Sequence, residues 1–178
     1  MGERLENDRN EVLEANRIYH RLLADTYDAE QTFVSHAYIQ KFFLNDLDSI
    51  LGGLQDRQRP LRILDCGAGT GNLTLKFLER GCHVTATDIS PEMLNELKKK
   101  INPAHLSRFE CHVQDIDSFL QGATENYDVV CSSSFLHHLP NYKETYRWML
   151  RRFALREEKC IPLTSQEVIG GNHWYKIS

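Results

Sequence analysis

Three carboxylates stand at the ends of short segments whose composition is typical of β-strands. Asp65 closes the run 61–65, Asp88 closes the run 83–88, and Asp115 follows the run 109–113. Helical patterns at 72–80 and after Ser90-Pro91 separate these runs, and this alternation predicts a parallel α/β sheet. Ligands of such sheets bind beyond the carboxyl ends of the strands, so we expect the three carboxylates to line one site. Carboxylates there can accept ribose hydroxyls or an exocyclic amine.

A glycine loop follows the first of these carboxylates. Gly67, Gly69 and Gly71 occupy alternate positions, and an amphipathic helix begins at Asn72. A strand, a tight loop and a helix N-terminus together turn backbone N–H groups toward a ligand. A Cβ atom would block both the positive-φ turn and the close approach of that ligand. The loop therefore predicts a site for a small, partly anionic molecule.

Taken together, these motifs make the chain resemble the class I S-adenosylmethionine-dependent methyltransferases. The resemblance covers about 61–150. The matching segments are Asp65 to Gly71, Thr87 to Met93, Gln114 to Ile116, Tyr127 to Ser133 and Leu136 to Pro140. The resemblance implies a methyltransferase that uses S-adenosyl-L-methionine and a Rossmann-like, doubly wound, mostly parallel sheet.

The resemblance also implies which residues hold the methionine part of the cofactor. The backbone of the glycine loop would bind it through Gly67, Ala68, Gly69 and Gly71. Asp65 would either order this loop or bind the amino group. Ser132 would line the floor near the methyl group, and Tyr27 would close over it or serve as a packing tyrosine.

The adenosine part of the cofactor is implied to lie against the next two strand ends. Asp88 would accept the ribose hydroxyls, with Ile89 and Met93 against the adenine ring. Asp115 would accept from the adenine amine, with Ile116 beside the ring. Asp115 also has a simpler reading as part of a turn, in which Asp117 caps the next short helix.

A dinucleotide site is the competing interpretation. The nicotinamide fingerprint requires Gly-x-Gly-x-x-Gly or Ala, whereas Asn72 occupies its sixth position here. Asp88 suits either cofactor. Asp115 and the His137-His138 pair favour the methyltransferase interpretation.

Methyl transfer itself asks little of side chains, because proximity, in-line orientation and exclusion of water supply most of the rate enhancement. His138 is the candidate proton acceptor, and the alternative is a histidine packed at a helix start. Some ubiquinone-pathway O-methyltransferases resemble this segment but have acids where this chain has Ser134 and His137. We therefore expect no metal.

The composition is that of one ordinary domain. The chain has 178 residues, 41% hydrophobic and 26% charged, and a net charge of −4, so a basic excess for nucleic acid is absent. Its five cysteines form no Cys-x-x-Cys pair, which favours buried thiols in a reducing compartment. With no signal-peptide pattern and no apolar run near ~18 residues, we expect a cytoplasmic protein without a membrane span.

We expect three regions: an N-terminal helical lid over 1–56, the cofactor-binding core over 57–155 and a divergent tail over 156–178. The lid contains helical patterns at 7–24 and 31–51. In the tail, the run 160–164 is a candidate fifth strand but contains Pro162, which favours an edge strand or no strand at all. Too little chain is expected to follow for strands five to seven, so we expect a sheet that is incomplete at its C-terminal side.

Two functions follow from these expectations. The first is a methyltransferase that transfers the methyl group directly to an unidentified small molecule. The second is a non-catalytic module that binds S-adenosylmethionine or a partner. An open sheet edge would favour association with a second copy of the chain.

Overall fold

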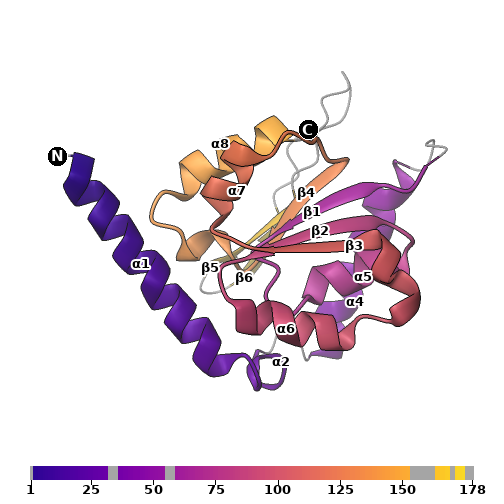
Figure 1. Ribbon diagram of the computed structural model, residues 1–178. Coiled ribbons are helices and arrows are strands. Elements are labelled where there is room, and N and C mark those ends of the chain that lie inside the picture. The colour runs from indigo at the N-terminus through magenta and orange to yellow at the C-terminus, as the bar shows by residue number, and fades with distance from the viewer. Residues whose placement is uncertain (1, 32–35, 55–58, 153–162, 169–170, 175–178) are drawn as a thin grey trace.

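The computed structural model describes residues 2–31, 36–54, 59–152, 163–168 and 171–174. Its centre is a six-stranded sheet with the order β3-β2-β1-β4-β5-β6 (Figure 1). The strands are β1 (Arg62–Cys66), β2 (His83–Asp88), β3 (Phe109–Val113), β4 (Val129–Ser133), β5 (Leu163–Val168) and β6 (Gly171–Trp174). All pairings are parallel except that of β5 with β6. The predicted α/β, mostly parallel fold is confirmed.

Helices cover both faces of this sheet (Figure 1). On one face lie α4 (Ala37–Gly52), α5 (Asn72–Glu79) and α6 (Pro91–Lys100); on the other lie α7 (Ile116–Gly122) and α8 (Tyr142–Arg152). Two short 3-10 helices, η1 (Pro103–Arg108) and η2 (Leu136–His138), precede β3 and follow β4. The chain is therefore doubly wound around the sheet, as the strand–helix alternation predicts.

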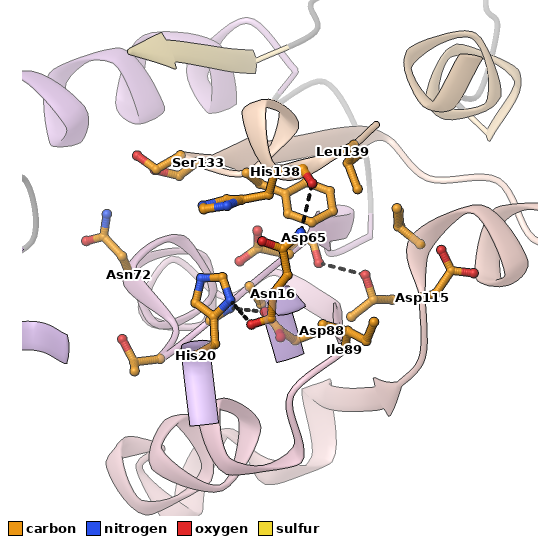
Figure 2. A pocket seen from close by; sticks show the side chains of 18 of the residues that line it. Asn16, His20, Asp65, Asn72, Asp88, Ile89, Asp115, Ser133, His138 and Leu139 are labelled. Carbon is orange, nitrogen blue, oxygen red and sulfur yellow. Dashed lines mark hydrogen bonds between the residues drawn. The ribbon is translucent and has the colours of Figure 1, made fainter. Parts of the chain in front are cut away.

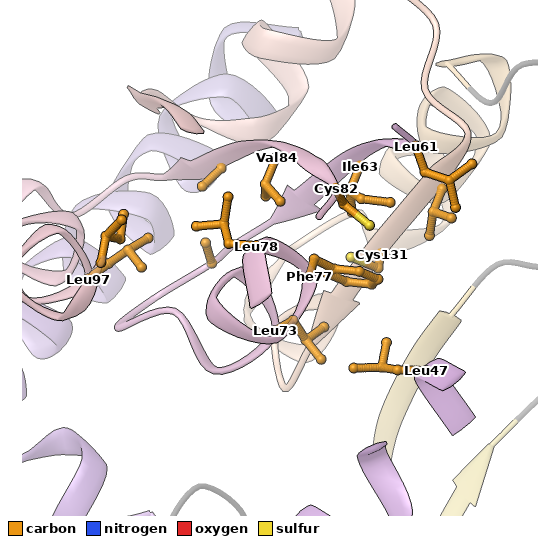
Figure 3. Packing of buried hydrophobic residues seen from close by; sticks show 14 of the residues in the cluster. Leu47, Leu61, Ile63, Leu73, Phe77, Leu78, Cys82, Val84, Leu97 and Cys131 are labelled. Atoms are coloured by element: carbon orange, nitrogen blue, oxygen red, sulfur yellow. The ribbon is translucent and has the colours of Figure 1, made fainter. Parts of the chain in front are cut away.

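The two faces have separate hydrophobic cores because neighbouring residues of a strand point to opposite sides. Ile63 belongs to the core beneath α4 and α5, where it packs with Phe77 and Leu47 (Figure 3). Leu64, the next residue of β1, belongs to the core beneath α7 and α8. Ile63, Leu64 and Phe77 are fully buried, and burial of each such side chain stabilises the fold by roughly 1.5–3 kcal/mol.

The helix that follows β2 begins as its sequence predicts. Ser90 is the N-cap of α6, and its Oγ accepts a hydrogen bond of 3.2 Å from the backbone N–H of Met93. Pro91 is the first helical residue, where its missing N–H costs nothing. This cap ends β2 sharply and leaves Asp88 at the edge of the sheet.

The N-terminal segment forms α1 (Gly2–Leu23), α2 (Tyr27–Glu30) and α4. Figure 1 shows α1 to one side of the sheet, near the ends of β2 and β3 where α6 and α7 begin. Its inner side carries Arg9, Leu13 and Asn16, which are only partly exposed, whereas Val12 and Tyr19 are exposed. The side of α1 that carries Arg9, Leu13 and Asn16 therefore faces the carboxyl edge of the sheet and covers it.

The prediction that too little chain remains for further strands is wrong for strands five and six. β5 pairs in parallel with β4, with Cys131 opposite Leu163, and β6 pairs antiparallel with β5. β5 begins at Leu163, after Pro162, and lies between β4 and β6, so the expectation of an edge strand or no strand is wrong. Residues 160–162 of the predicted strand 160–164 lie outside the described residues. The sheet in the described part of the chain has six strands. In the described part of the chain, no helix has the length and apolar character needed to cross a membrane.

Candidate functional site

A cavity lies at the carboxyl ends of the parallel strands (Figure 2). Its wall combines the loop after β1, the ends of β2 and β3, the segment after β4, and one side of α1. The predicted site residues that line it are Tyr27, Asp65, Gly67, Ala68, Gly69, Asp88, Ile89, Asp115, Ile116 and His138. Residues from four strand ends thus surround one space, although a cofactor contact by each of them stays a prediction.

The glycine loop has the backbone that its sequence predicts. Gly67, Gly69 and Gly71 have φ values of 67°, 54° and 94°, in the left-handed region that favours glycine. A Cβ atom on Gly67 would lie 2.1 Å from Cδ2 of Phe135. Gly67 is therefore required both for its φ angle and for the close packing of the Phe135 ring on the loop.

Asp88 ties the end of β2 to this loop. Its Oδ2 accepts a hydrogen bond of 2.8 Å from the backbone N–H of Gly69, and its Oδ1 accepts one of 2.9 Å from that of Ser90. Burial raises the pKa of Asp88, and the backbone donors act in the opposite direction. The carboxylate thus orients the loop in addition to lining the cavity.

Asp65 lies at the base of the same loop and is 2% exposed. Thr74, in the first turns of α5, donates a hydrogen bond of 2.7 Å from Oγ1 to its Oδ2. Burial raises the pKa of Asp65 to about 6, the Thr74 hydrogen bonds opposing it. This contact to α5 supports the loop-ordering role that was one of the two alternatives for Asp65.

Asp115 is the N-cap of α7. Its carboxylate accepts hydrogen bonds from the backbone N–H groups of Asp117, at 3.3 Å, and Ser118, at 3.1 Å. Arg9 of α1 also contacts it, with 2.5 Å between Nη2 and Oδ1. The helix is therefore capped by Asp115 rather than by Asp117, and Asp115 combines this cap with a place in the cavity wall.

Sequence reasoning missed the contribution of α1 to the cavity. Leu13, Asn16 and His20 line it, and their spacing of three and four residues is the signal that they share one helix face. Asn16 Nδ2 donates a hydrogen bond of 2.9 Å to the backbone oxygen of His138 (Figure 2). This bond joins α1 to η2 across the cavity.

Two histidines face each other at this junction. The ring centroids of His20 and His138 are 5.0 Å apart, in an edge-on arrangement. His20 Nδ1 lies 2.8 Å from the backbone oxygen of Asn16. A carbonyl oxygen can only accept, so Nδ1 carries the proton and Nε2 is the unprotonated nitrogen of neutral His20.

His138 is electrostatically disfavoured as a cation. Burial, followed by the neighbouring His137 and His20, lowers its pKa to about 4. The imidazole is therefore neutral near pH 7 and can accept a proton, although as a weak base.

The short helix α2 makes a second junction beside the glycine loop. Tyr27 lines the cavity. The hydroxyl of Thr70 donates to Asp28, and Lys100 Nζ lies 2.6 Å from the other carboxylate oxygen of Asp28. α2 is thus attached to both the loop and the end of α6.

Three predicted site residues do not line the cavity. Gly71 is the N-cap of α5, Met93 is fully buried in α6, and Ser132 is buried within β4. β4 ends at Ser133, one residue later than predicted, and the next residue along a strand points to the other face. Ser133 and Ser134 line the cavity instead, and Ser134 has a φ of 49°.

Within the described segments, no group of three or more His, Cys, Asp or Glu side chains is arranged to hold a metal ion. Cys66, Cys82, Cys111 and Cys131 are free thiols. Burial raises the pKa of Cys66 and Cys131 well above the usual range, which makes them poor nucleophiles. Cys160 lies outside the described residues.

Comparison with known proteins identifies the class. Residues 63–154, more than half of the chain, match the family described as a methyltransferase domain. The chain belongs to this family, and its resemblance to the class I S-adenosylmethionine-dependent methyltransferases is confirmed.

Relatives in sequence come from several kinds of protein. The chain is 36% identical over 108 residues to the highly reducing polyketide synthase ctvA of Aspergillus terreus, covering 57% of this chain and 4% of that protein. It is 30% identical over 92 residues to the magnesium-protoporphyrin O-methyltransferase of Rhodobacter capsulatus, covering 52% and 41%. It is 27% identical over 129 residues to the malonyl-[acyl-carrier protein] O-methyltransferase of Bacillus cereus, covering 71% and 46%. The chain spans less than half the length of each of these relatives.

Solved structures share the fold. The magnesium protoporphyrin IX methyltransferase ChlM of Synechocystis, crystallised with S-adenosylhomocysteine, superposes with a TM-score of 0.66 at 17% identity, covering 86% of this chain and 71% of that one. The complex of DhpI with S-adenosylmethionine superposes with a TM-score of 0.58 at 23% identity, covering 86% and 64%. At these identities the likeness establishes the fold.

Proposed function

We propose that this chain binds S-adenosylmethionine in the cavity and transfers its methyl group to a small-molecule acceptor. The observation that carries the proposal is the convergence of the glycine loop, Asp88 and Asp115 on one cavity at the carboxyl edge. This edge is where sheets of this kind bind nucleotides. Membership of the methyltransferase domain family supports the proposal.

The residues of the cavity suit such a cofactor. The loop from Gly67 to Gly71 would hold the methionine part, and Asp88 would accept from the ribose. Ile89 and Ile116, which both line the cavity, would enclose the adenine. Asp115 would accept from the adenine amine, in competition with Arg9.

When bound, S-adenosylmethionine supplies an electrophilic methyl group that a nucleophile in line with the carbon–sulfur bond can displace. The protein's contribution is to orient the acceptor and exclude water. α1 covers the cavity through the Arg9–Asp115 ion pair and the Asn16–His138 hydrogen bond. Closure by α1 would therefore keep water from the reacting atoms.

His138 is the proposed proton acceptor for a hydroxyl, amine or other protonated nucleophile. Its low pKa leaves it neutral near pH 7. Asn16 holds the backbone of His138, and His20 contacts its ring. This arrangement positions the imidazole at the cavity wall.

The acceptor is proposed to be a small molecule or an acyl group. The relatives' names support this class, since they specify magnesium-protoporphyrin and malonyl-[acyl-carrier protein] as substrates of those enzymes. Both names also specify O-methylation, which favours an oxygen nucleophile.

Isothermal titration calorimetry with S-adenosylhomocysteine, together with a methyl-release assay, tests the proposal. We expect wild-type protein to bind S-adenosylhomocysteine and Asp88→Asn to bind it more weakly. Asp25→Asn is the control, because it makes the same change in net charge at an exposed position. Absence of binding to wild-type protein would overturn the proposal. Binding without methyl release from any small acceptor would favour the alternative, a non-catalytic binding module.

A further inference from the structure

Asn72, the first residue of α5, lines the cavity and is held in one orientation by two donors. Lys76 Nζ lies 2.7 Å from its side-chain Oδ1, and Gln40 Nε2 of α4 lies 3.1 Å from the same oxygen. An amide flip would place an N–H group against these donors, so the two contacts assign the oxygen. The Nδ2 amide NH₂ group must therefore face away from Lys76 and Gln40.

The Nδ2 atom of Asn72 is buried and has no hydrogen-bond partner in the described part of the chain. Ser133, at the end of β4, has the same property: its Oγ is buried and unpartnered among the described residues. Leaving a buried polar group unpaired costs about 1–3 kcal/mol. Two such atoms in the wall of one cavity indicate a ligand that completes them.

Figure 2 shows Asn72 and Ser133 on the opposite side of the pocket from Asp115. His138 is drawn on the same side as Ser133. Asn72 and Ser133 therefore lie away from the carboxylate proposed to accept from adenine, on the side of His138, the proposed proton acceptor.

The chemistry of the two groups specifies the ligand. An amide N–H can only donate, so the group that meets Asn72 must be an acceptor. Lys76 also donates to the backbone oxygen of Asn72, at 2.6 Å, which places a cationic group behind the amide. The N-terminus of α5 adds to the same electrostatic preference for negative charge.

We propose that Asn72 Nδ2 and Ser133 Oγ donate hydrogen bonds to a ligand carboxylate. The proposal rests on the proposed function. Two sources supply that chemistry: the methionine carboxylate of the cofactor, or a carboxylate of the methyl acceptor. Lys76 and Gln40 act as positioning residues, because they orient the amide without facing the ligand.

The test replaces the donor by an acceptor of the same shape. Asn72→Asp keeps an oxygen for Lys76 and Gln40 but places a second carboxylate oxygen where Nδ2 was. Ser133→Ala removes the hydroxyl without added bulk. Asn95→Asp, at an exposed position of α6, makes the same chemical change on the surface and is the matched control.

Three probes are titrated into each protein by calorimetry: S-adenosylhomocysteine, its decarboxylated analogue, and malonate added to protein saturated with S-adenosylhomocysteine. If the cofactor supplies the carboxylate, Asn72→Asp weakens S-adenosylhomocysteine at least about tenfold and leaves the decarboxylated analogue within about threefold. If the acceptor supplies it, Asn72→Asp weakens malonate by a similar factor and leaves S-adenosylhomocysteine unchanged. Ser133→Ala shows the same pattern with a smaller factor, and Asn95→Asp matches wild-type protein.

The proposal is overturned if Asn72→Asp and Ser133→Ala bind both carboxylate probes as wild-type protein does, or if wild-type protein shows no preference for a carboxylate. Circular dichroism checks that each variant folds, and Ser133→Ala decides alone if Asn72→Asp does not fold. If wild-type protein binds neither adenosine probe, the cofactor proposal fails. Malonate is then titrated into unliganded protein to test the carboxylate subsite separately. Weaker binding by Asn72→Asp and Ser133→Ala than by wild-type protein supports the subsite, and equal binding or no binding overturns it.

Discussion

The two halves of the cavity differ in how their polar groups are satisfied. At the ends of β2 and β3, Asp88 and Asp115 each accept hydrogen bonds from at least two backbone N–H groups of the protein. At the ends of β1 and β4, Asp65 accepts from a threonine hydroxyl, while Asn72 and Ser133 each have a buried atom with no hydrogen-bond partner among the described residues. We call the first the completed half, because its carboxylates are paired within the protein, and the second the incomplete half, because two of its buried atoms lack a partner among the described residues.

This difference reflects the range of the contacts that build each half. Asp88 and Asp115 each accept from a residue two or three positions later, which a local turn brings into place, and Asp88 also accepts from Gly69, 19 residues earlier in the glycine loop. Asn72 depends on Gln40, 32 residues earlier, and β4 must pack beside β1 before Ser133 reaches the cavity. Local turns thus supply part of the first half, whereas Gln40 reaches Asn72, and Ser133 reaches the cavity, only through tertiary packing.

The pH dependence of stability should show the largest difference, at Asp65. Its pKa is about 6 in the folded protein against a usual 3.8. The folded state then binds more protons at Asp65 between these values, so the contribution of Asp65 to stability falls as pH rises from about 4 to about 6, by about 3 kcal/mol in total. Asp65→Asn should remove this loss, as measured by urea unfolding at pH 4 and pH 7.

His138 provides the control for this measurement, because its pKa shift has the opposite sign. A pKa of about 4 against a usual 6.5 means that the folded state binds fewer protons in this window, so stability rises with pH. His138→Gln should therefore steepen the loss of stability with rising pH where Asp65→Asn reduces it. Equal pH profiles for wild-type protein and Asp65→Asn would contradict the assigned pKa shift.

Asp88→Asn should produce the next largest effect, on ligand affinity in the completed half. One amide N–H group would replace an acceptor that faces the backbone N–H of Gly69 or Ser90. We expect S-adenosylhomocysteine to bind about thirtyfold more weakly, a loss of about 2 kcal/mol. Calorimetry measures this change, and an unchanged affinity would show that Asp88 has no part in binding.

Substitution of the loop glycines separates backbone strain from packing in the incomplete half. Gly67→Ala combines a φ of 67° with a Cβ only 2.1 Å from Phe135, whereas Gly69→Ala has a φ of 54° and no atom within 4 Å of its Cβ. The φ strain alone costs about 1–2 kcal/mol. We expect Gly67→Ala to lower the free energy of unfolding by about 1 kcal/mol more than Gly69→Ala does, and equal losses in urea unfolding would exclude a packing role for Phe135.

Arg9→Gln should have the smallest effect, because its ion pair with Asp115 is partly exposed. The side chains are 31% and 14% exposed, so we expect a loss of less than about 1 kcal/mol that decreases as salt is added. Arg17→Gln, which removes an exposed pair with Glu14 on the same helix, is the control. Protease digestion near α1 should increase in Arg9→Gln alone, and identical digestion of both variants would contradict a role for Arg9 in holding α1.

Much of the completed half could be predicted from sequence. β2 and β3 have the predicted bounds, and their terminal carboxylates line the cavity. Alternation of apolar residues and the Ser90-Pro91 helix start act over a few positions, so they are readable without knowing the fold. The glycine loop belongs to the same class of signal, because its φ angles depend on residue type.

The sequence did not predict which serine at the end of β4 faces the cavity. The run 127–132 predicts the strand, but pairing with β1 begins at Val129, and β4 extends to Ser133. Neighbouring residues of a strand point to opposite faces, and the packing of β4 beside β1 places Ser133 rather than Ser132 at the cavity. Pairing with a neighbouring strand sets that register, and the pattern within one strand does not.

Local spacing in the sequence thus determines the parallel sheet, the glycine loop and the positions of Asp65, Asp88 and Asp115. Tertiary packing alone decides that α1 places Asn16 and His20 against His138, that Gln40 orients Asn72, and that β5 and β6 extend the sheet. The physical reason is range: turns and helix caps form between residues a few positions apart, whereas these contacts exist only after whole helices and strands have packed together.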